Sequence, residues 1–348
     1  MFVDLDSPDT ELFIDDLGDF MAGEPIGSPF GAWLLLAATG RRGQEPVAEA
    51  DRLLGCIPDG LKAAVAAWGD VHDVPDQTWL ERGPIPTRTQ ADEWAHRNTD
   101  GLIPTFPGKI PSPEPNAFLL ASAVLAKTAW IEPLSIRPSA QLAGEFSSHV
   151  EHCLFVPHDV HNIRLCEVGA DVCVVVSNRG ANGVTVHSVL GPQRWSAFTG
   201  QHVARVFARG RSYPASDDWA RACFELDVAT EPIRSMDGDK FEAYLPAWLA
   251  GTTGIDLSDA PGFAGLGDAA VQGAYARFDA IGFEAAAVTA VDRAGAPMRE
   301  DDATRYTVRF NRPYAFAAGY RLDGPWRGMP LFEGWVTGDS LIEPEPYE

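Results

Sequence analysis

The stretch that decides the fold of this chain is IGFEAAAVTAV, residues 281–291. In a β-strand successive side chains point to opposite faces, so Ala285, Ala287 and Thr289 would share one face if this stretch became a strand. Small side chains on that face would let the segment slide under an existing sheet. The stretch therefore predicts a hinge that leads into an exposed loop. Two further apolar stretches follow a polar segment: RYTVRFNRPYAFAAGY (305–320) and MPLFEGWV (329–336).

Further motifs follow the order of one known family: SPFGAWLLLAATG (28–40), ADEWAHRNTDGLI (91–103), FLLASAVLAKTAW (118–130) and GIDLSDAPGFAGL (254–266). Together with the hinge stretch they resemble the serpin (serine protease inhibitor) superfamily, bacterial type, over nearly the whole chain. The resemblance implies an α+β serpin fold. Such a fold has a large central mixed sheet, two further sheets, helices packed around them and an exposed reactive-centre-like loop. It also implies a single domain over 1–348, with the hinge and loop at 281–304.

In serpins, which are the established example of loop insertion, a cut in the loop lets the hinge enter the large sheet as a new central strand. The resemblance places the hinge at Gly282, Phe283, Glu284, Ala285, Ala287 and Thr289. Counting forward from Gly282 places the scissile bond at Ala296-Pro297, whereas counting back from Phe310 places it near Met298-Arg299. Proline has no N–H and is a poor leaving side for a serine protease. We therefore expect cleavage after Met298 or Arg299.

The hinge departs from the family pattern at Phe283, where inhibitory members carry a small Ser or Thr. Insertion would bury this ring beneath the sheet, and overpacking a close-packed site typically costs about 1–3 kcal/mol. We expect the bulky ring to slow insertion rather than forbid it, because the other hinge residues are small.

A second departure lies under the sheet, where strands must part to admit the loop. The family joins an Asn on the central strand and a His on the hinge strand to a buried Ser by hydrogen bonds. This chain keeps the serine as Ser28 but aligns Ser122 with the Asn and Gln272 with the His. Trp130 matches the tryptophan beneath the upper hinge. Ser and Gln still form hydrogen bonds, with a different reach, so the shutter and breach are expected to be retuned or abandoned.

The net charge of the chain excludes several classes of binding partner. The 348 residues carry a formal net charge of -22, which would repel nucleic acid, heparin-like polyanions and anionic membranes. The acidic start MFVDLDSPDTELF lacks the basic flank of a signal peptide, so the expected location is cytoplasmic. Five cysteines, an odd and scattered set, predict at least one free thiol and no disulfide framework.

A dense group of donor side chains is a further chemical pattern: His152, Cys153, His158, Asp159, His161 and Cys166. Its spacing fits no standard zinc site, and we interpret it as a polar hairpin turn between two strands. A metal site, or acid–base chemistry at His158, Asp159 or His161, are the alternatives. We predict no cofactor and no metal, and no catalytic constellation identifies an enzyme.

Three functions follow from these residues. A serpin-fold binding protein without inhibitory activity, or an enzyme acting on a small molecule, is favoured by the divergent hinge, shutter and scissile site. The alternative is a covalent suicide inhibitor of a serine protease, cut near Met298-Arg299. The partner is thus a serine protease if the protein is inhibitory, and otherwise a small molecule or another protein. Fold alone does not decide among them.

Periodicity predicts the local elements. Helices are expected at 12–21, 30–39, 46–54, 89–97 and 241–250. Strands are expected at 118–130, 153–156, 163–168, 172–176, 184–190, 207–213, 271–279 and 307–310.

Overall fold

The computed structural model describes residues 8–40, 43–71, 74–157, 162–252, 254–264, 270–283 and 301–346. The α-helices are α1 (Pro8–Phe20), α2 (Pro29–Thr39), α3 (Gln44–Leu54), α4 (Arg88–Asn98), α5 (Ala197–Ala208) and α6 (Trp219–Glu225). Short 3-10 helices are η1 (Ser139–Gln141), η2 (Glu145–Ser148) and η4 (Gly338–Ser340). Within these ranges no helix is both long enough and apolar enough to cross a membrane.

The strands group into ladders. One sheet has the order β19 (Pro330–Val336), β18 (Tyr314–Tyr320), β9 (Val184–Leu190), β8 (Asp171–Arg179), β7 (Asn162–Val168). A second has the order β10 (Ala229–Ser235), β17 (Asp301–Arg309), β11 (Lys240–Leu245), β6 (His152–Pro157), β5 (Ser135–Pro138). The remaining strands form three hydrogen-bonded groups: β2 (Leu80–Gly83), β1 (Leu61–Gly69), β3 (Phe118–Ala126); β13 (Ile255–Asp256), β14 (Val271–Gln272); and β20 (Leu341–Ile342), β12 (Ala247–Gly251), β15 (Tyr275–Phe278), β16 (Gly282–Phe283), β4 (Thr128–Ala129). We call these three groups together the central sheet, because β4 directly follows β3 along the chain and β15 follows β14.

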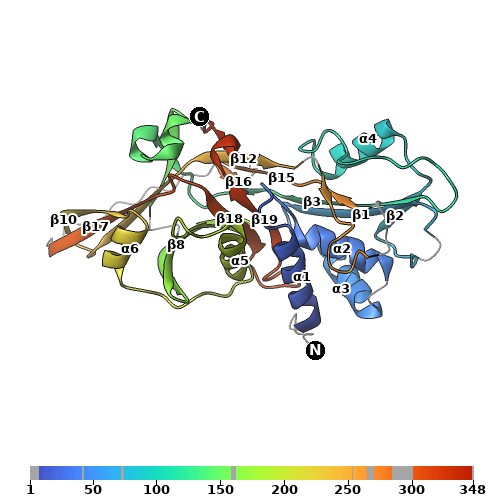
Figure 1. Cartoon of the computed structure of the whole chain (residues 1–348), viewed down its shortest axis with the longest axis horizontal. Coiled ribbons are helices and arrows are strands. Elements are labelled where there is room, and N and C mark those ends of the chain that lie inside the picture. The colour runs from blue at the N-terminus through green and yellow to red at the C-terminus, as the bar shows by residue number, and fades with distance from the viewer. Residues whose placement is uncertain are drawn as a thin grey trace.

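The central sheet changes its neighbours along its length. At one end, β3 meets the chain just before β14 directly, through a parallel bridge between Leu120 and Ala270. At the other end, β4 and β15, which continue those two strands, are separated by β16. Figure 1 shows β12, β15 and β16 at one end of this sheet and β3, β1 and β2 at the other. The sheet is therefore closed at one end and wedged open by β16 at the other.

Helix α2 forms the centre of the core. Its eleven residues are all buried, as a helix that is apolar all round must be. It begins at Ser28, whose hydroxyl accepts from the amide of Gly31, and it ends at Gly40 with φ of 63°. One face of β1 and β3 contributes Val65, Ala67 and Leu120 to the same core as α2. The other face packs against α4, through Trp68, Trp94 and their neighbours. Alternation along β1 and β3 therefore supplies two cores, one on each face.

A buried ion network joins α1, α5 and β19. The guanidinium of Arg205 is 1% exposed and the carboxylate of Glu333 is 0% exposed. Two parallel bonds link them, at 2.6 and 2.9 Å. Arg205 Nη1 also donates to the backbone oxygen of Asp15 at 2.8 Å and to Asp19 Oδ1 at 3.0 Å. Burial disfavours this cation, but the charges of Glu333 and Asp19 outweigh burial and raise the pKa of Arg205.

Four of the predicted helices are confirmed as α1 to α4, but the helix expected at 241–250 is wrong. That stretch forms β11 and β12, on either side of Pro246, which has no N–H to donate in a helix. The strand expected at 207–213 is also wrong, because its first residues end α5. The buried residues of α5 include Gly200, Val203, Ala204, Phe207 and Ala208, a helical spacing that follows the capping Ser196.

Two further expectations are corrected. The loop does not extend to residue 304, because 301–304 lie in β17 and pair with β10. The group at 152–166 is not a hairpin, since β6 is paired on both sides, by β5 and β11, and has no free edge for β7. Strand β7 pairs with β8 in a different sheet.

Candidate functional site

The chain enters β16 through a turn at 279–281 that is closely held; we call this turn together with β16 the hinge anchor. Four consecutive backbone carbonyls accept hydrogen bonds there. The donors are Trp130 Nε1 to Asp279 (2.8 Å), the amide of Leu134 to Ala280 (2.7 Å), the amide of Trp130 to Ile281 (3.0 Å) and the amide of Asp279 to Gly282 (2.9 Å). Each buried acceptor is thus satisfied, which fixes the turn in one conformation.

The carboxylate of Asp279 holds the same turn from the other side. It accepts from Arg277 Nη2 at 2.6 Å and from the amides of Ala280 at 2.7 Å and Glu345 at 3.0 Å. Asp279 is 3% exposed, and a buried carboxylate needs such partners. The hinge anchor is therefore tied both to Trp130 and to the C-terminal segment.

Phe283 is already inside the sheet. The backbone of Phe283 pairs with Thr128 of β4 and with Phe278 of β15, and Phe283 is 1% exposed. The ring lies 6.3 Å from Trp248 and 6.4 Å from Phe332, between centroids. The expected overpacking cost refers to a slot that fits Ser or Thr, whereas here the ring lies in an aromatic cluster.

The shutter residues converge beneath the sheet. The amide of Ser28 donates to Gln272 Oε1 at 2.8 Å, and Gln272 Nε2 donates to the carbonyl of Ser28 at 2.7 Å. The Ser28 hydroxyl donates to the carbonyl of Leu331 at 2.7 Å. A Cβ on Gly31 would lie 3.0 Å from Gln272 Nε2 and 3.3 Å from Ser122 Oγ, so glycine lets these groups meet. Ser122 Oγ itself is buried and has no partner within the described ranges.

Gln272→Leu is expected to lower the free energy of unfolding by about 1–3 kcal/mol, because it leaves the buried amide of Ser28 without a partner, while the carbonyl of Ser28 keeps its bond from the amide of Ala32. Urea unfolding followed by circular dichroism measures the change. Gln141→Leu, at an exposed position, is the matched control and should unfold like the parent protein. Equal stability of the two variants would contradict the pairing of Gln272 with Ser28.

The donor group at 152–166 is only partly within the described residues. His152 Nδ1 lies 3.2 Å from Glu343 Oε2 on the surface, while Cys153 and Cys166 are buried in different sheets. Burial raises the pKa of each of these two thiols to about 11. Within the described ranges no three His, Cys, Asp or Glu side chains are grouped to hold a metal, and all five cysteines are free thiols.

Several predicted residues lie outside the described ranges, and their roles stay predictions. They are the candidate catalytic residues His158, Asp159 and His161; the hinge residues Glu284, Ala285, Ala287 and Thr289; and the reactive-loop residues Ala296, Pro297, Met298 and Arg299.

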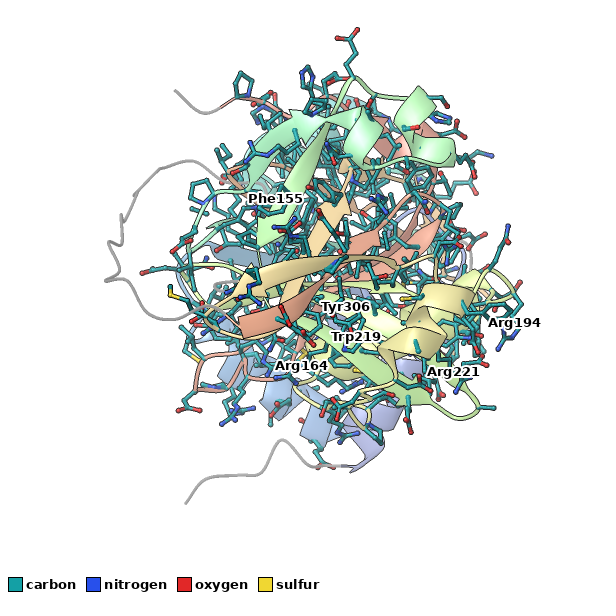
Figure 2. The ribbon with its side chains drawn as sticks, turned by 90° about the vertical axis from the view of Figure 1, so that its left-hand side faces the viewer. Phe155, Arg164, Arg194, Trp219, Arg221 and Tyr306 are labelled. Atoms are coloured by element: carbon teal, nitrogen blue, oxygen red, sulfur yellow. The ribbon has the colours of Figure 1, made fainter. Side chains whose placement is uncertain are left out.

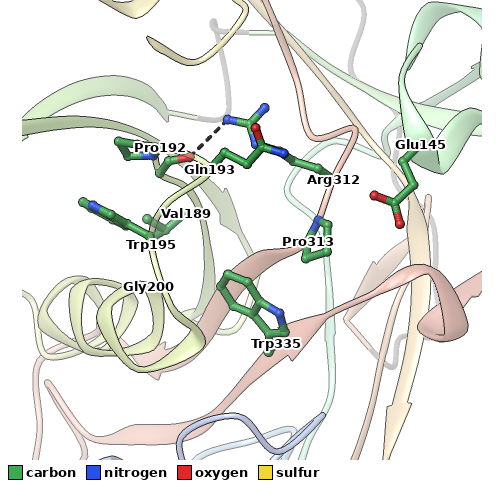
Figure 3. Close-up of a pocket in the computed structure, with 10 residues that line it drawn as sticks. Glu145, Val189, Pro192, Gln193, Trp195, Gly200, Arg312, Pro313 and Trp335 are labelled. Carbon is green, nitrogen blue, oxygen red and sulfur yellow. Dashed lines mark hydrogen bonds between the residues drawn. The ribbon is translucent and has the colours of Figure 1, made fainter.

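A cavity that sequence reasoning missed lies where β9 runs into α5 and where β18 begins. Its volume is about 340 Å³, and Arg312, Trp195 and Trp335 are among its walls (Figure 3). A second cavity, of about 560 Å³, includes Arg164 and Trp219 in its lining. The ring of Trp219 lies beside that of Tyr306, with centroids 5.0 Å apart (Figure 2). No local motif marks either cavity, because the walls come from distant parts of the sequence.

Comparison with solved structures decides the architecture. Serpin48 of the insect Tenebrio molitor, described as highly specific, superposes with a TM-score of 0.55 at 13% identity, over 96% of this chain and 99% of its own. The chain has the serpin fold. Human thyroxine-binding globulin complexed with thyroxine gives a TM-score of 0.58 at 13% identity, over 94% and 98% of the two chains.

Another solved serpin, native protease nexin-1 with heparin, gives 0.58 at 12% identity, over 94% and 97%. No protein-family model matches the sequence, and no curated protein matches it. At these identities the similarity establishes the serpin fold alone. The shutter and breach residues Ser28, Ser122, Gln272 and Trp130 therefore keep their serpin roles as predictions, although the fold brings the first three together and places Trp130 against the hinge anchor.

Proposed function

We propose that this protein is a serpin-fold binding protein and not an efficient inhibitor of proteases. The observation that carries the proposal is the hinge anchor. Gly282 and Phe283 are already paired between β15 and β4 in the intact chain. The contacts that they would gain by insertion are therefore already made, and cutting the loop cannot release their free energy a second time.

The aromatic ring adds to this effect. Burial of a phenylalanine side chain contributes about 1.5–3 kcal/mol relative to exposure, and here that contribution stabilises the uncut state. Ligand binding on this fold has a structural counterpart in thyroxine-binding globulin, which was solved with thyroxine. A binding function therefore suits both the anchored hinge and the fold.

The test compares the melting of intact and cut protein. Limited trypsin treatment cuts after Arg299, mass spectrometry locates the cut, and the control receives inactivated trypsin. We expect the midpoint to rise by no more than a few degrees, since about 1 kcal/mol shifts it by roughly 2–4 °C in a large domain. A rise of 20 °C or more would reflect many newly made contacts, on the order of several kcal/mol, and would refute the proposal.

A second candidate, covalent inhibition, is favoured by the direction of β16. Strand β16 runs antiparallel to both β15 and β4. The inserted strand would have the same direction if insertion of the hinge extended β16. In that case the serine of a protease would attack the carbonyl carbon of Met298 or Arg299. The peptide bond that follows this residue would break, and the amine of the next residue would leave. The resulting ester would survive denaturation. A denaturant-resistant complex with trypsin or chymotrypsin, lost in Arg299→Ala or Met298→Ala, would establish it.

A further inference from the structure

The cavity beside α5 contains a cation with few partners. Arg312 precedes β18, and its side chain is 15% exposed. Its Nη2 donates to the carbonyl of Gly191 at 3.1 Å, its Nη1 to Asn311 Oδ1 at 3.5 Å, and the exposed carboxylate of Asp227 is 4.0 Å away. Figure 3 shows Arg312 among the residues that line the cavity, with a dashed line for a hydrogen bond of its guanidinium. A guanidinium has five N–H donors, so most of its capacity is unused within the described chain.

Burying the Arg312 guanidinium without an anion costs free energy. Burial lowers the pKa of the Arg312 guanidinium, and the charge of Asp227 offsets this only in part. A mostly buried cation is normally paired, because removal from water is otherwise uncompensated. Two buried arginines of α5 follow that rule: Arg205 and Arg209 both contact carboxylates. Arg312 is thus available to a ligand.

Apart from Glu145 and Gln193, the remaining side chains that line the cavity are apolar or aromatic. Trp195 and Trp335 flank the cavity, with Val189, Pro192 and Pro313. Glycines let both indoles lie close to the backbone, since a Cβ on Gly191 would lie 2.1 Å from Trp195 and one on Gly200 would lie 2.9 Å from Trp335. Trp195 is also fixed by its Nε1, which donates to Asp171 Oδ2 at 2.6 Å. Two positioned indoles suit a flat ring, by stacking or edge contact.

We propose that this cavity binds a small aromatic monocarboxylate, with the carboxylate on Arg312 and the ring between Trp195 and Trp335. The inference rests on the proposed binding function and names the ligand class for it. Arginine matches a carboxylate with two parallel N–H donors. The volume of about 340 Å³ lies at the small end for ligand sites, so the ligand has one or two rings.

The charge around the site favours one negative charge over two. Glu145 also lines the cavity and is exposed, and the chain as a whole has a net charge of -22. Both repel a dianion more strongly than a monoanion. A carboxylate therefore fits this site better than a phosphate monoester.

Isothermal titration calorimetry tests the assignment with benzoate, phenylacetate and indole-3-acetate. Indole-3-acetamide is the uncharged match for indole-3-acetate, and phenyl phosphate supplies the dianion. At least one of the three carboxylates should bind. Indole-3-acetamide should bind at least about 10-fold more weakly than indole-3-acetate. Arg312→Met should weaken the carboxylate by about 10- to 100-fold, the loss of a hydrogen bond to a charged group, and abolish the preference over the amide. Trp335→Leu should weaken acid and amide alike.

Arg327→Met, on an exposed arginine, is the matched control and should bind like the parent protein. Should Arg312→Met fail to fold, Arg312→Lys keeps the charge without the planar fork and should give an intermediate loss. Binding of no carboxylate, equal binding of acid and amide, tighter binding of phenyl phosphate, or unchanged affinity in Arg312→Met would each overturn the assignment. None of these results bears on the melting of cut protein, so the site and the proposed function fail separately.

Discussion

Arg205→Met is expected to lower the free energy of unfolding by about 3–5 kcal/mol, because it leaves the carboxylate of Glu333 buried without its cation. Glu333 is 0% exposed, so water cannot replace the guanidinium. The variant also loses the bonds from Arg205 to Asp15 and Asp19 of α1, so that Arg209 keeps its ion pair with Asp15 as a remaining link between α5 and α1. Urea unfolding of the purified variant, with the parent protein in parallel, measures the effect.

Two further variants separate the charge from the packing. Arg327→Met makes the same substitution at a surface ion pair, where the expected change is small. The double variant Arg205→Met with Glu333→Met removes both charges, and we expect it to be more stable than Arg205→Met, since an apolar pair can replace a buried ion pair. If Arg205→Met lost less than about 1 kcal/mol, the network would not hold the three elements together.

Phe283→Ala is expected to cost about 3–5 kcal/mol of stability in the intact protein, the usual range for emptying a buried phenylalanine site. The ring contacts Trp248 and Phe332 at the wedged end of the sheet. Phe283→Thr, which restores the small side chain of the serpin pattern, should also destabilise the uncut chain. Thermal and urea unfolding of each variant measure the change.

Phe224→Ala is the control for this change, because Phe224 is 89% exposed and its removal should leave stability almost unaltered. A cost at Phe283 no larger than that at Phe224 would mean that the ring does not anchor the hinge. Melting of cut Phe283→Ala protein then reports whether the emptied site is filled again after cleavage.

Much of the fold could be predicted because local patterns agreed with the tertiary structure. The apolar run of α2 behind Ser28 and Pro29 contains a cap and a helix start that need no distant partner. The stretches at 163–168 and 172–176 alternate or run apolar as strands do, and they pair as β7 and β8. The stretch at 241–250 misled because apolar spacing alone does not separate a helix from two buried strands.

Only part of the candidate sites could be predicted from the sequence. Ser28, Ser122 and Gln272 were selected by resemblance, and the fold brings them to one place. The bonds between Gln272 and the backbone of Ser28 depend on a contact between residues 244 positions apart, which no local pattern encodes. The cavity at Arg312 gave no signal, since its walls are drawn from β9, α5, β19 and the segment before β18.

By itself, the sequence determined the serpin fold and most of the helices, because motif order, capping and periodicity are properties of the chain that can be read without its folded structure. Only the tertiary structure decided that Phe283 is already buried, that Arg205 and Glu333 neutralise each other inside the protein, and that Arg312 faces a cavity with few partners. Burial, pairing of charges and the space left between side chains arise from segments far apart in sequence, so they exist only once the chain has folded.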